Sequence, residues 1–176
     1  MAEFRGHVFI GVSADGFIAR PDGALEWLTG RELDMNDSGY PEFFAGVDGL
    51  IMGRTTYETV LEFDEWPYEK PLYVISSTLS ESGREDVSVH PDVESAIAAF
   101  TGDGHTDAYV DGGVTIQSFL AAGLIDTITL SYAPVLIGEG ARLFGAVPAD
   151  IELELLEAKE LPADFAQTRY RVKRSR

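Results

Sequence analysis

Hydrophobic and polar positions along the first two thirds of the chain predict short buried strands that alternate with helices. Apolar runs that end in turn signals predict strands within residues 7–13, 48–53, 71–78 and 107–113. Apolar residues at helical spacing predict helices within residues 41–47, 55–63, 88–100 and 114–126, and the segment 88–100 begins with a weak strand. This alternation is typical of a mainly parallel, buried sheet with helices on its faces.

The last third of the chain has a different pattern, in which polar and apolar residues alternate strictly. Residues 127–132, 151–155 and 167–174 show this period of two, which predicts half-buried antiparallel strands. The second segment is rich in Glu and the third in Arg, so we expect them to pair as a hairpin through residues 161–164. The terminal basic cluster is then a solvated face that pairs with its acidic neighbour, and an anion-binding patch is the alternative.

Composition agrees with this pattern, and the net charge limits the classes of molecule that the protein can bind. The chain has 176 residues, 45% of them hydrophobic and 24% charged, which fits one globular domain spanning residues 1–176. The acidic net charge of −17 disfavours nucleic acid and membranes as partners, because both require a positive protein surface. The sequence has no long apolar window, no signal peptide and no cysteine, so we expect a cytoplasmic protein without disulfides.

Several familiar catalytic motifs are absent from the sequence. His7, His90 and His105 lack metal-ligand spacing, and the lack of cysteine disfavours a structural zinc site, so we expect no metal. The sequence also lacks the Gly-x-Ser-x-Gly elbow, the phosphate loop of nucleotide triphosphatases, and Gly-x-Gly-x-x-Gly after the first strand. The remaining chemistry is the kind that a bound organic cofactor supplies.

Three predicted strand ends carry small or hydroxyl residues that suit a phosphate group. They are residues 53–56, 76–78 and 111–113, and two of them open directly into a helix. Ligands of open α/β sheets bind beyond the carboxyl ends of the strands, and helix N-termini attract phosphate through unpaired N–H groups. Glycines let the backbone approach an anion closely, and Arg54 can contact a phosphate through two N–H groups.

Each strand end also has a purely structural interpretation. Thr55 and Glu58 have the spacing of a capping box, which would only start a helix and contributes about 1 kcal/mol. Residues 76–78 could form a turn, and Gly112 with Gly113 could serve close packing. The joint placement at three neighbouring strand ends favours the functional interpretation, and a capping hydroxyl and a phosphate can share one helix start.

The order of several motifs resembles the dihydrofolate-reductase-like superfamily. GVSADGFIA at residues 11–19 is similar to its Ser-Leu-Asp-Gly-x-Ile-Ala opening, and IMGRTTYE at residues 51–58 is similar to its Met-Gly-Arg-x-Thr-Trp/Tyr-Glu motif. Residues 108–144 resemble one branch, the reductase domain of the bifunctional riboflavin-biosynthesis deaminase–reductase and its free-standing relatives. The resemblance covers about residues 6–145, and the sequence contains no deaminase domain.

The resemblance implies an α/β, three-layer αβα fold, in which a mostly parallel central sheet of about eight strands carries an antiparallel C-terminal hairpin. It also implies NADPH as the hydride donor, with Gly53 and Thr56 at the pyrophosphate and Arg54 at the 2′-phosphate. The full set of implied cofactor-binding residues is Gly11, Ile18, Ala19, Gly53, Arg54, Thr55, Thr56, Ser76, Ser77, Asp111, Gly112, Gly113, Val114, Thr115 and Ile116.

The resemblance further implies a small, flat heterocyclic substrate beside the nicotinamide. The residues expected to border it are Phe9, Asp15, Trp27, Phe44, Tyr57 and Val110. Asp15 is the candidate proton donor, with water as one alternative and a turn-stabilising role for Asp15 as another. The implied activity is that of an NADPH-dependent oxidoreductase, best matched by the 5-amino-6-(5-phosphoribosylamino)uracil reductase of riboflavin biosynthesis.

Two departures from the family pattern bear on specificity. Val114 stands where folate reductases often have a basic residue, so we expect a softened preference for NADPH over NADH. No carboxylate in residues 31–44 aligns securely with the pterin-binding one, which disfavours folate as the substrate. Dihydrofolate reductase activity and a non-catalytic nucleotide-binding protein on the same fold are the alternatives. Family analogy and exposed edges such as residues 133–144 also predict a homodimer.

Overall fold

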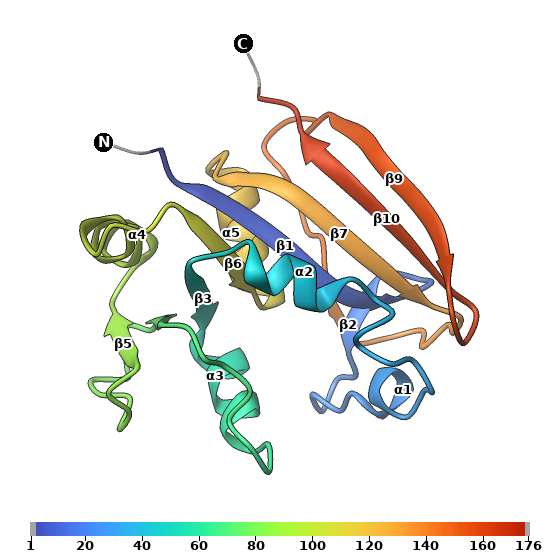
Figure 1. The fold of residues 1–176 in the computed structure, drawn as a ribbon, viewed down its shortest axis with the longest axis horizontal. Coiled ribbons are helices and arrows are strands. Elements are labelled where there is room, and N and C mark those ends of the chain that lie inside the picture. The colour runs from blue at the N-terminus through green and yellow to red at the C-terminus, as the bar shows by residue number, and fades with distance from the viewer. Residues whose placement is uncertain (1–2, 175–176) are drawn as a thin grey trace.

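Eight strands form one sheet in the computed structural model, which describes residues 3–174 (Figure 1). In sheet order they are β5 (Val87–His90), β4 (Leu72–Ile75), β3 (Gly49–Gly53), β6 (Asp107–Asp111), β1 (Arg5–Ser13), β7 (Ile125–Ala133), β10 (Phe165–Val172) and β9 (Leu153–Leu161). The first six strands are parallel, and β10 and β9 are antiparallel to their neighbours. The predicted sheet and its C-terminal hairpin are confirmed. Two short strands, β2 (Phe17–Ala19) and β8 (Ala141–Arg142), pair with each other outside this sheet.

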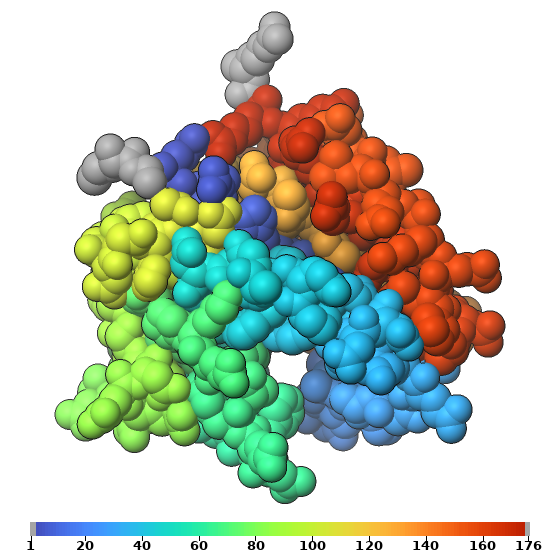
Figure 2. Space-filling view, viewed as in Figure 1, coloured from blue at the N-terminus to red at the C-terminus, as the bar shows by residue number. Residues whose placement is uncertain are grey.

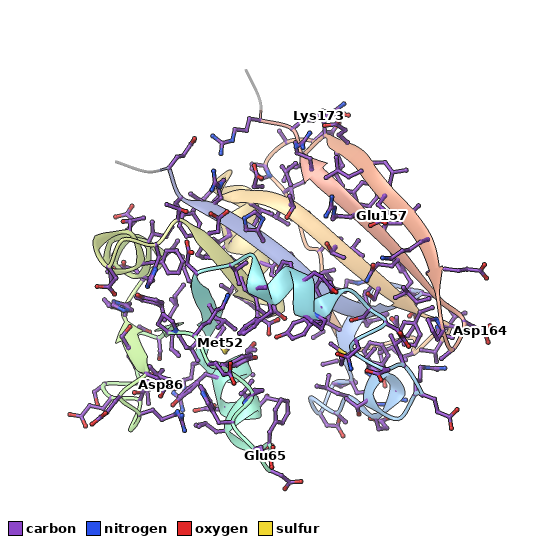
Figure 3. The ribbon with its side chains drawn as sticks, viewed as in Figure 1. Met52, Glu65, Asp86, Glu157, Asp164 and Lys173 are labelled. Atoms are coloured by element: carbon purple, nitrogen blue, oxygen red, sulfur yellow. The ribbon has the colours of Figure 1, made fainter. Side chains whose placement is uncertain are left out.

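Helices cover both faces of the sheet, which confirms the three-layer arrangement. They are α1 (Glu26–Thr29), α2 (Tyr40–Ala45), α3 (Arg54–Leu61), α4 (Val93–Gly102) and α5 (Gly113–Ala121). Strand β3 explains why two layers form: Ile51 packs into one apolar cluster with α4 and α5, whereas Leu50 and Met52 pack into the other with α2 and α3. Met52, labelled in Figure 3, therefore points to the α2 face. None of the helices within residues 3–174 combines the length and apolar character needed to cross a bilayer.

Strand β7 departs from the half-buried antiparallel strand that its alternation predicts. It runs parallel to β1 on one side and antiparallel to β10 on the other, so it lies inside the sheet. Its polar positions face the α2 layer rather than solvent, and Thr129 and Ser131 are each only 5% exposed. Alternation of residue types therefore identified the strand but misjudged the exposure of its polar face.

Strand β9 departs from its pattern in the opposite sense. Its alternation predicts buried leucines, but Leu153 is 38% exposed and Leu155 is 57% exposed. The reason is that β9 is an edge strand and the described helices do not cover it on that face. The expected charge pairing across the hairpin is confirmed, because Arg171 Nη1 donates to Glu154 Oε2 at 3.0 Å.

The turn of the hairpin holds two residues in the left-handed region of backbone space. Ala163 has φ of 60° and Asp164 has φ of 63°, and Asp164 marks the tip of the hairpin in Figure 3. Glycine adopts this conformation without the steric cost that alanine incurs. We expect Ala163→Gly to raise the free energy of unfolding by about 0.5–1 kcal/mol, measured by urea denaturation. A lower stability of this variant would contradict the assignment of strain to Ala163.

Candidate active site

The carboxyl ends of β3, β4 and β6 lie next to one another in the sheet. Strand β3 pairs in parallel with both neighbours, so that Gly53 is opposite Ile75 and Met52 is opposite Asp111. The three strand ends that were predicted to be neighbours are therefore adjacent in space. In the space-filling view, an opening lies beside α2, between the green atoms around α3 and the blue atoms around β2 and α1 (Figure 2).

The first turns of α3 and α5 approach each other so closely that glycine is required between them. Gly112 has φ of +93°, and a Cβ atom there would collide with Thr56 Oγ1. A Cβ atom on Gly53 would lie 2.9 Å from Thr115 Oγ1. Within residues 3–174, neither of these threonine hydroxyls makes a hydrogen bond to the protein. Two glycines and two unpaired hydroxyls thus form a small cradle between the helix starts, which we call the strand-end cradle (Gly53, Thr56, Gly112 and Thr115).

The N-terminus of α5 opens into this cradle. The first hydrogen bond of the helix runs from the Ile116 N–H to the Gly112 carbonyl, so the preceding N–H groups have no partner inside the helix. These groups carry a partial positive charge that suits an anion. A Cβ atom on Gly113 would lie 2.8 Å from Ile18 Cδ1, which brings β2 to the same helix start. Val114, by contrast, is 79% exposed and points away from the packed surroundings.

Helix α3 begins earlier than the predicted capping box requires. Gly53 is the N-cap residue in an extended conformation, Arg54 is already helical, and no side chain in the described part of the chain caps the helix. The proposed Thr55–Glu58 cap is therefore wrong. Glu58 instead accepts a hydrogen bond from Arg54 Nε at 2.6 Å, as expected for oppositely charged residues four positions apart in a helix.

The guanidinium of Arg54 reaches across to the end of β4. Its Nη1 donates to Thr78 Oγ1 at 2.7 Å, a contact that the sequence analysis missed. Ser76 Oγ accepts from the N–H groups of Thr78 and Leu79, so Ser76 does form the turn that was the structural alternative. Ser77 is exposed beside it. The turn after β4 therefore positions Arg54 at the edge of the strand-end cradle.

Asp111, at the end of β6, turns its carboxyl toward the α2 layer. Burial raises its pKa to about 6, although the Gly112 N–H donates to Oδ1 at 2.9 Å and opposes this shift. Burial first, and the charge of Asp111 second, raise the pKa of Tyr40 to about 12. The same two causes raise the pKa of Tyr68 and Tyr109. The carboxyl of Asp111 therefore lies near three phenols, of which Tyr68 and Tyr109 are buried and Tyr40 is partly buried.

Flat aromatic rings from α2 and from the loop between α3 and β4 form a wall beside Asp111. Tyr40 and Phe44 stack with ring centroids 5.7 Å apart, and Phe44 stacks on Tyr68 at 6.3 Å. Lys70 fixes the end of α2, because its Nζ donates to the Phe44 carbonyl at 2.5 Å and also to the Val47 carbonyl. Such a wall suits a planar ring, and the neighbouring carboxyl can exchange a proton or a hydrogen bond with it.

Asp15, the predicted proton donor, has the contacts of a structural residue. Its carboxylate accepts hydrogen bonds from Ser13 Oγ at 2.6 Å and from the N–H groups of Ile137 and Gly138 at 3.2 and 2.8 Å. The Ser13 hydroxyl first, and then these backbone groups, lower the pKa of Asp15. A carboxylate held in its ionised form is a poor acid, so these contacts favour the turn-stabilising alternative.

The predicted substrate residues do not all reach this wall. Phe9 and Phe44 do, since Phe9 packs on Phe43 and Tyr40. Val110 is fully buried on the opposite face of the sheet with α5, because consecutive residues of a strand point to opposite faces. Tyr57 is 1% exposed and donates its hydroxyl to the Ser82 carbonyl. Trp27 packs in a separate cluster with Phe165. Val110, Tyr57 and Trp27 therefore do not border the aromatic wall, which corrects the prediction that they contact the substrate.

The remaining predicted residues frame the opening on its other side. A Cβ atom on Gly11 would lie 2.7 Å from Leu28, so α1 closes over β1 at this point. Ala19 ends β2, and its carbonyl lies against Gly140, next to the short strand β8. Sequence reasoning missed Leu28, Tyr40 and Tyr68 because each acts through a tertiary contact that leaves no local pattern.

Comparison with known proteins agrees with this architecture. The family model described as the RibD C-terminal domain matches residues 7–166. The uncharacterised protein YwjB of Bacillus subtilis strain 168 is 30% identical over 157 residues, which cover 87% of this chain and 90% of YwjB.

Solved structures give the same result. A Shewanella sp. PV-4 protein provisionally assigned to riboflavin biosynthesis superposes with a TM-score of 0.89 at 39% identity, covering 97% of this chain and 99% of that one. A pyrimidine reductase-like protein of Corynebacterium diphtheriae has the same fold, with a TM-score of 0.70 at 16% identity and coverage of 97% and 92%.

Proposed function

The chain belongs to the RibD C-terminal domain family, and on that premise we propose that it is an NADPH-dependent reductase of a small conjugated heterocycle. The best candidate substrate class is a pyrimidine of the riboflavin pathway, of the kind that 5-amino-6-(5-phosphoribosylamino)uracil reductases accept. The observation that carries this proposal is the adjacency of two features at one sheet edge: the strand-end cradle and the buried carboxyl of Asp111.

The strand-end cradle fits the pyrophosphate of a dinucleotide. Gly53 and Gly112 leave room that a Cβ atom would fill, and Thr56 and Thr115 offer hydroxyls that the protein leaves unpaired within residues 3–174. The unpaired N–H groups at the start of α5 supply further donors. Arg54, held by Glu58 and Thr78, is the candidate contact for the 2′-phosphate. When bound there, NADPH supplies the hydride.

The role of this chain is then to orient the substrate, exclude water and move one proton. The rings of Tyr40, Phe44 and Tyr68 hold a flat heterocycle beside the sheet edge. Asp111, with a pKa of about 6, is partly protonated near neutral pH and can donate a proton or a hydrogen bond to a ring nitrogen. We therefore assign the acid role to Asp111 rather than to Asp15.

The test measures NADPH binding and then turnover. Titration with NADPH should quench tryptophan fluorescence, because Trp66 packs edge-on against Tyr57 and Tyr68 on this side of the molecule. Loss of NADPH absorbance should follow addition of a reducible aminopyrimidine but not of dihydrofolate. The proposal fails if NADPH shows no saturable binding at millimolar concentration. Saturable binding without turnover of any pyrimidine, pterin or quinonoid compound would favour the non-catalytic alternative.

Replacement of Arg54 tests how the cofactor is recognised. We expect Arg54→Ala to weaken NADPH binding by about 10- to 100-fold, since a hydrogen bond to a charged group contributes about 1.5–3 kcal/mol. NADH lacks the 2′-phosphate, so its dissociation constant should change much less. Arg174→Ala is the matched control, because it removes the same charge at the site of the Glu3 ion pair. Equal losses for NADPH and NADH would show that Arg54 does not contact the 2′-phosphate.

A further inference from the structure

A second hollow lies between α2 and the C-terminal hairpin, on the face of the sheet seen in Figure 2, where atoms of β7 form its floor between α2 and β10. Its volume is about 670 Å³, within the usual range of about 300–1,000 Å³ for small-molecule sites. Strands β1, β7 and β10 provide the floor, and α2 and β9 provide the walls; Glu157 marks β9 in Figure 3. We call this hollow the hairpin groove.

The floor of the hairpin groove consists of rows of side chains that cross the sheet in register. In the first row, His7 bonds Thr127 Oγ1 at 2.7 Å through Nδ1 and Asp107 at 2.8 Å through Nε2. In the same row, Arg171 is paired with Glu154. In the third row, Gln167 Nε2 donates to Ser131 Oγ at 2.9 Å. The polar groups of both rows are therefore partnered within the protein.

The middle row differs, because its polar groups have no partner among residues 3–174. Thr129 is directly opposite Phe9 on one side and Arg169 on the other. Thr129 is 5% exposed and lines the groove, yet its hydroxyl makes no hydrogen bond to any residue between 3 and 174. Arg169 likewise makes no ion pair in that part of the chain, whereas the neighbouring Arg171 does. The Thr129 hydroxyl and the exposed Arg169 guanidinium therefore both line the groove with hydrogen-bonding capacity that no other residue in the described part of the chain uses.

The surroundings of this pair indicate which kind of ligand could use both groups. The guanidinium fork matches a carboxylate, and a hydroxyl on the adjacent strand can donate to the same group. Phe9 and Phe43 line the groove with ring centroids 4.9 Å apart and offer a surface for an aromatic ring. Asp37 and Glu42 on the opposite wall disfavour a second negative charge.

We propose that the hairpin groove binds an aromatic monocarboxylate whose far end is neutral or positively charged. Its carboxylate lies between Arg169 and Thr129, and its ring packs on Phe9 and Phe43. The basic cluster of the last strand then has two roles: Arg171 pairs with its acidic neighbour, and Arg169 receives the ligand. The site is separate from the strand-end cradle and does not depend on the proposed reductase activity.

The test titrates the whole chain with 4-(aminomethyl)benzoate, benzoate and terephthalate by two-dimensional NMR, in the presence of NADPH and in its absence. We expect chemical-shift changes at the residues of the middle row of the groove floor. The affinity for the three compounds should fall in the order given, because the charge at the far end of the compound becomes more negative. Arg169→Gln should weaken the binding of 4-(aminomethyl)benzoate at least tenfold, and Thr129→Val should weaken it by about 2- to 10-fold. Thr129→Ser, which keeps the hydroxyl, and Arg174→Gln, which removes a remote charge, should leave the affinity close to wild type.

Three results would overturn the proposal. One is equal affinity of wild type and Arg169→Gln. Another is a shift pattern confined to the strand ends, which would show that the probe enters the proposed cofactor site. The third is light scattering that shows a stable dimer in which none of the probes binds, because a second copy of the chain would then cover the groove. Failure of NADPH to bind would count against the proposed reductase alone, because the probes are also titrated without it.

Discussion

A Gly112→Ala variant is expected to lose about 100-fold in NADPH affinity while the protein stays folded. Alanine at φ of +93° is strained, and its Cβ atom would collide with the hydroxyl of Thr56. Thr56 is short and β-branched, so its side chain has few rotamers with which to retreat. The methyl group would fill the strand-end cradle and separate a phosphate from at least one helix start. The loss of one or two charge-assisted hydrogen bonds corresponds to a factor of this size.

Gly123→Ala is the matched control for this experiment. Gly123, which follows α5, also has a positive φ of +69°, but a Cβ atom there would meet no other atom of the described residues within 4 Å. Both variants should lose stability in thermal unfolding through backbone strain, and only Gly112→Ala should lose the cofactor. An unchanged NADPH dissociation constant in Gly112→Ala would mean that the cradle does not hold the pyrophosphate, wherever else the cofactor binds.

The sequence predicted the sheet well because strand and helix alternate with clear turn signals between them. The runs before Gly53 and Gly112 are bounded by residues that only fit at element ends, and both ends lie where the pattern predicts. The C-terminal hairpin was predicted equally well, since its Glu and Arg residues complement each other across the two strands. These signals are local, and local signals suffice for the order of the elements.

Predictions failed where burial depends on distant parts of the chain. The period of two in β7 and β9 is the same, but β7 lies inside the sheet and β9 at its edge, so Thr129 is buried and Leu155 is exposed. Neighbouring residues of one strand also point to opposite faces, which is why Val110 packs in the core while Asp111 faces the aromatic wall. The choice of face follows from tertiary packing, which the pattern alone does not contain.

Replacement of Asp111 by asparagine is expected to reduce turnover and increase stability. A positioned general acid contributes about 10²- to 10⁴-fold, so the rate with a reducible pyrimidine should fall by a factor in this range. The stability effect follows from the raised pKa of Asp111, about 6 when folded and about 3.9 when unfolded. The folded protein retains a proton that the unfolded chain releases, so this carboxyl reduces stability as pH rises from about 4 to about 6. Above that window the full cost remains, roughly 1–3 kcal/mol.

The introduced asparagine cannot ionise but keeps an oxygen that accepts the Gly112 N–H, so Asp111→Asn should be more stable than wild type above about pH 7 and equally stable near pH 4. Urea denaturation at a series of pH values measures this difference.

Asp107→Asn, on the same strand and face, is a control of opposite sign, because Arg5, His7 and Thr106 bond Asp107 and lower its pKa. Its stabilising effect is present at neutral pH and is lost on acidification, so Asp107→Asn should destabilise the protein at about pH 7. If Asp111→Asn were instead less stable than wild type at about pH 8, the carboxylate would be a favourable part of the fold, and its role as a buried acid would have to be abandoned.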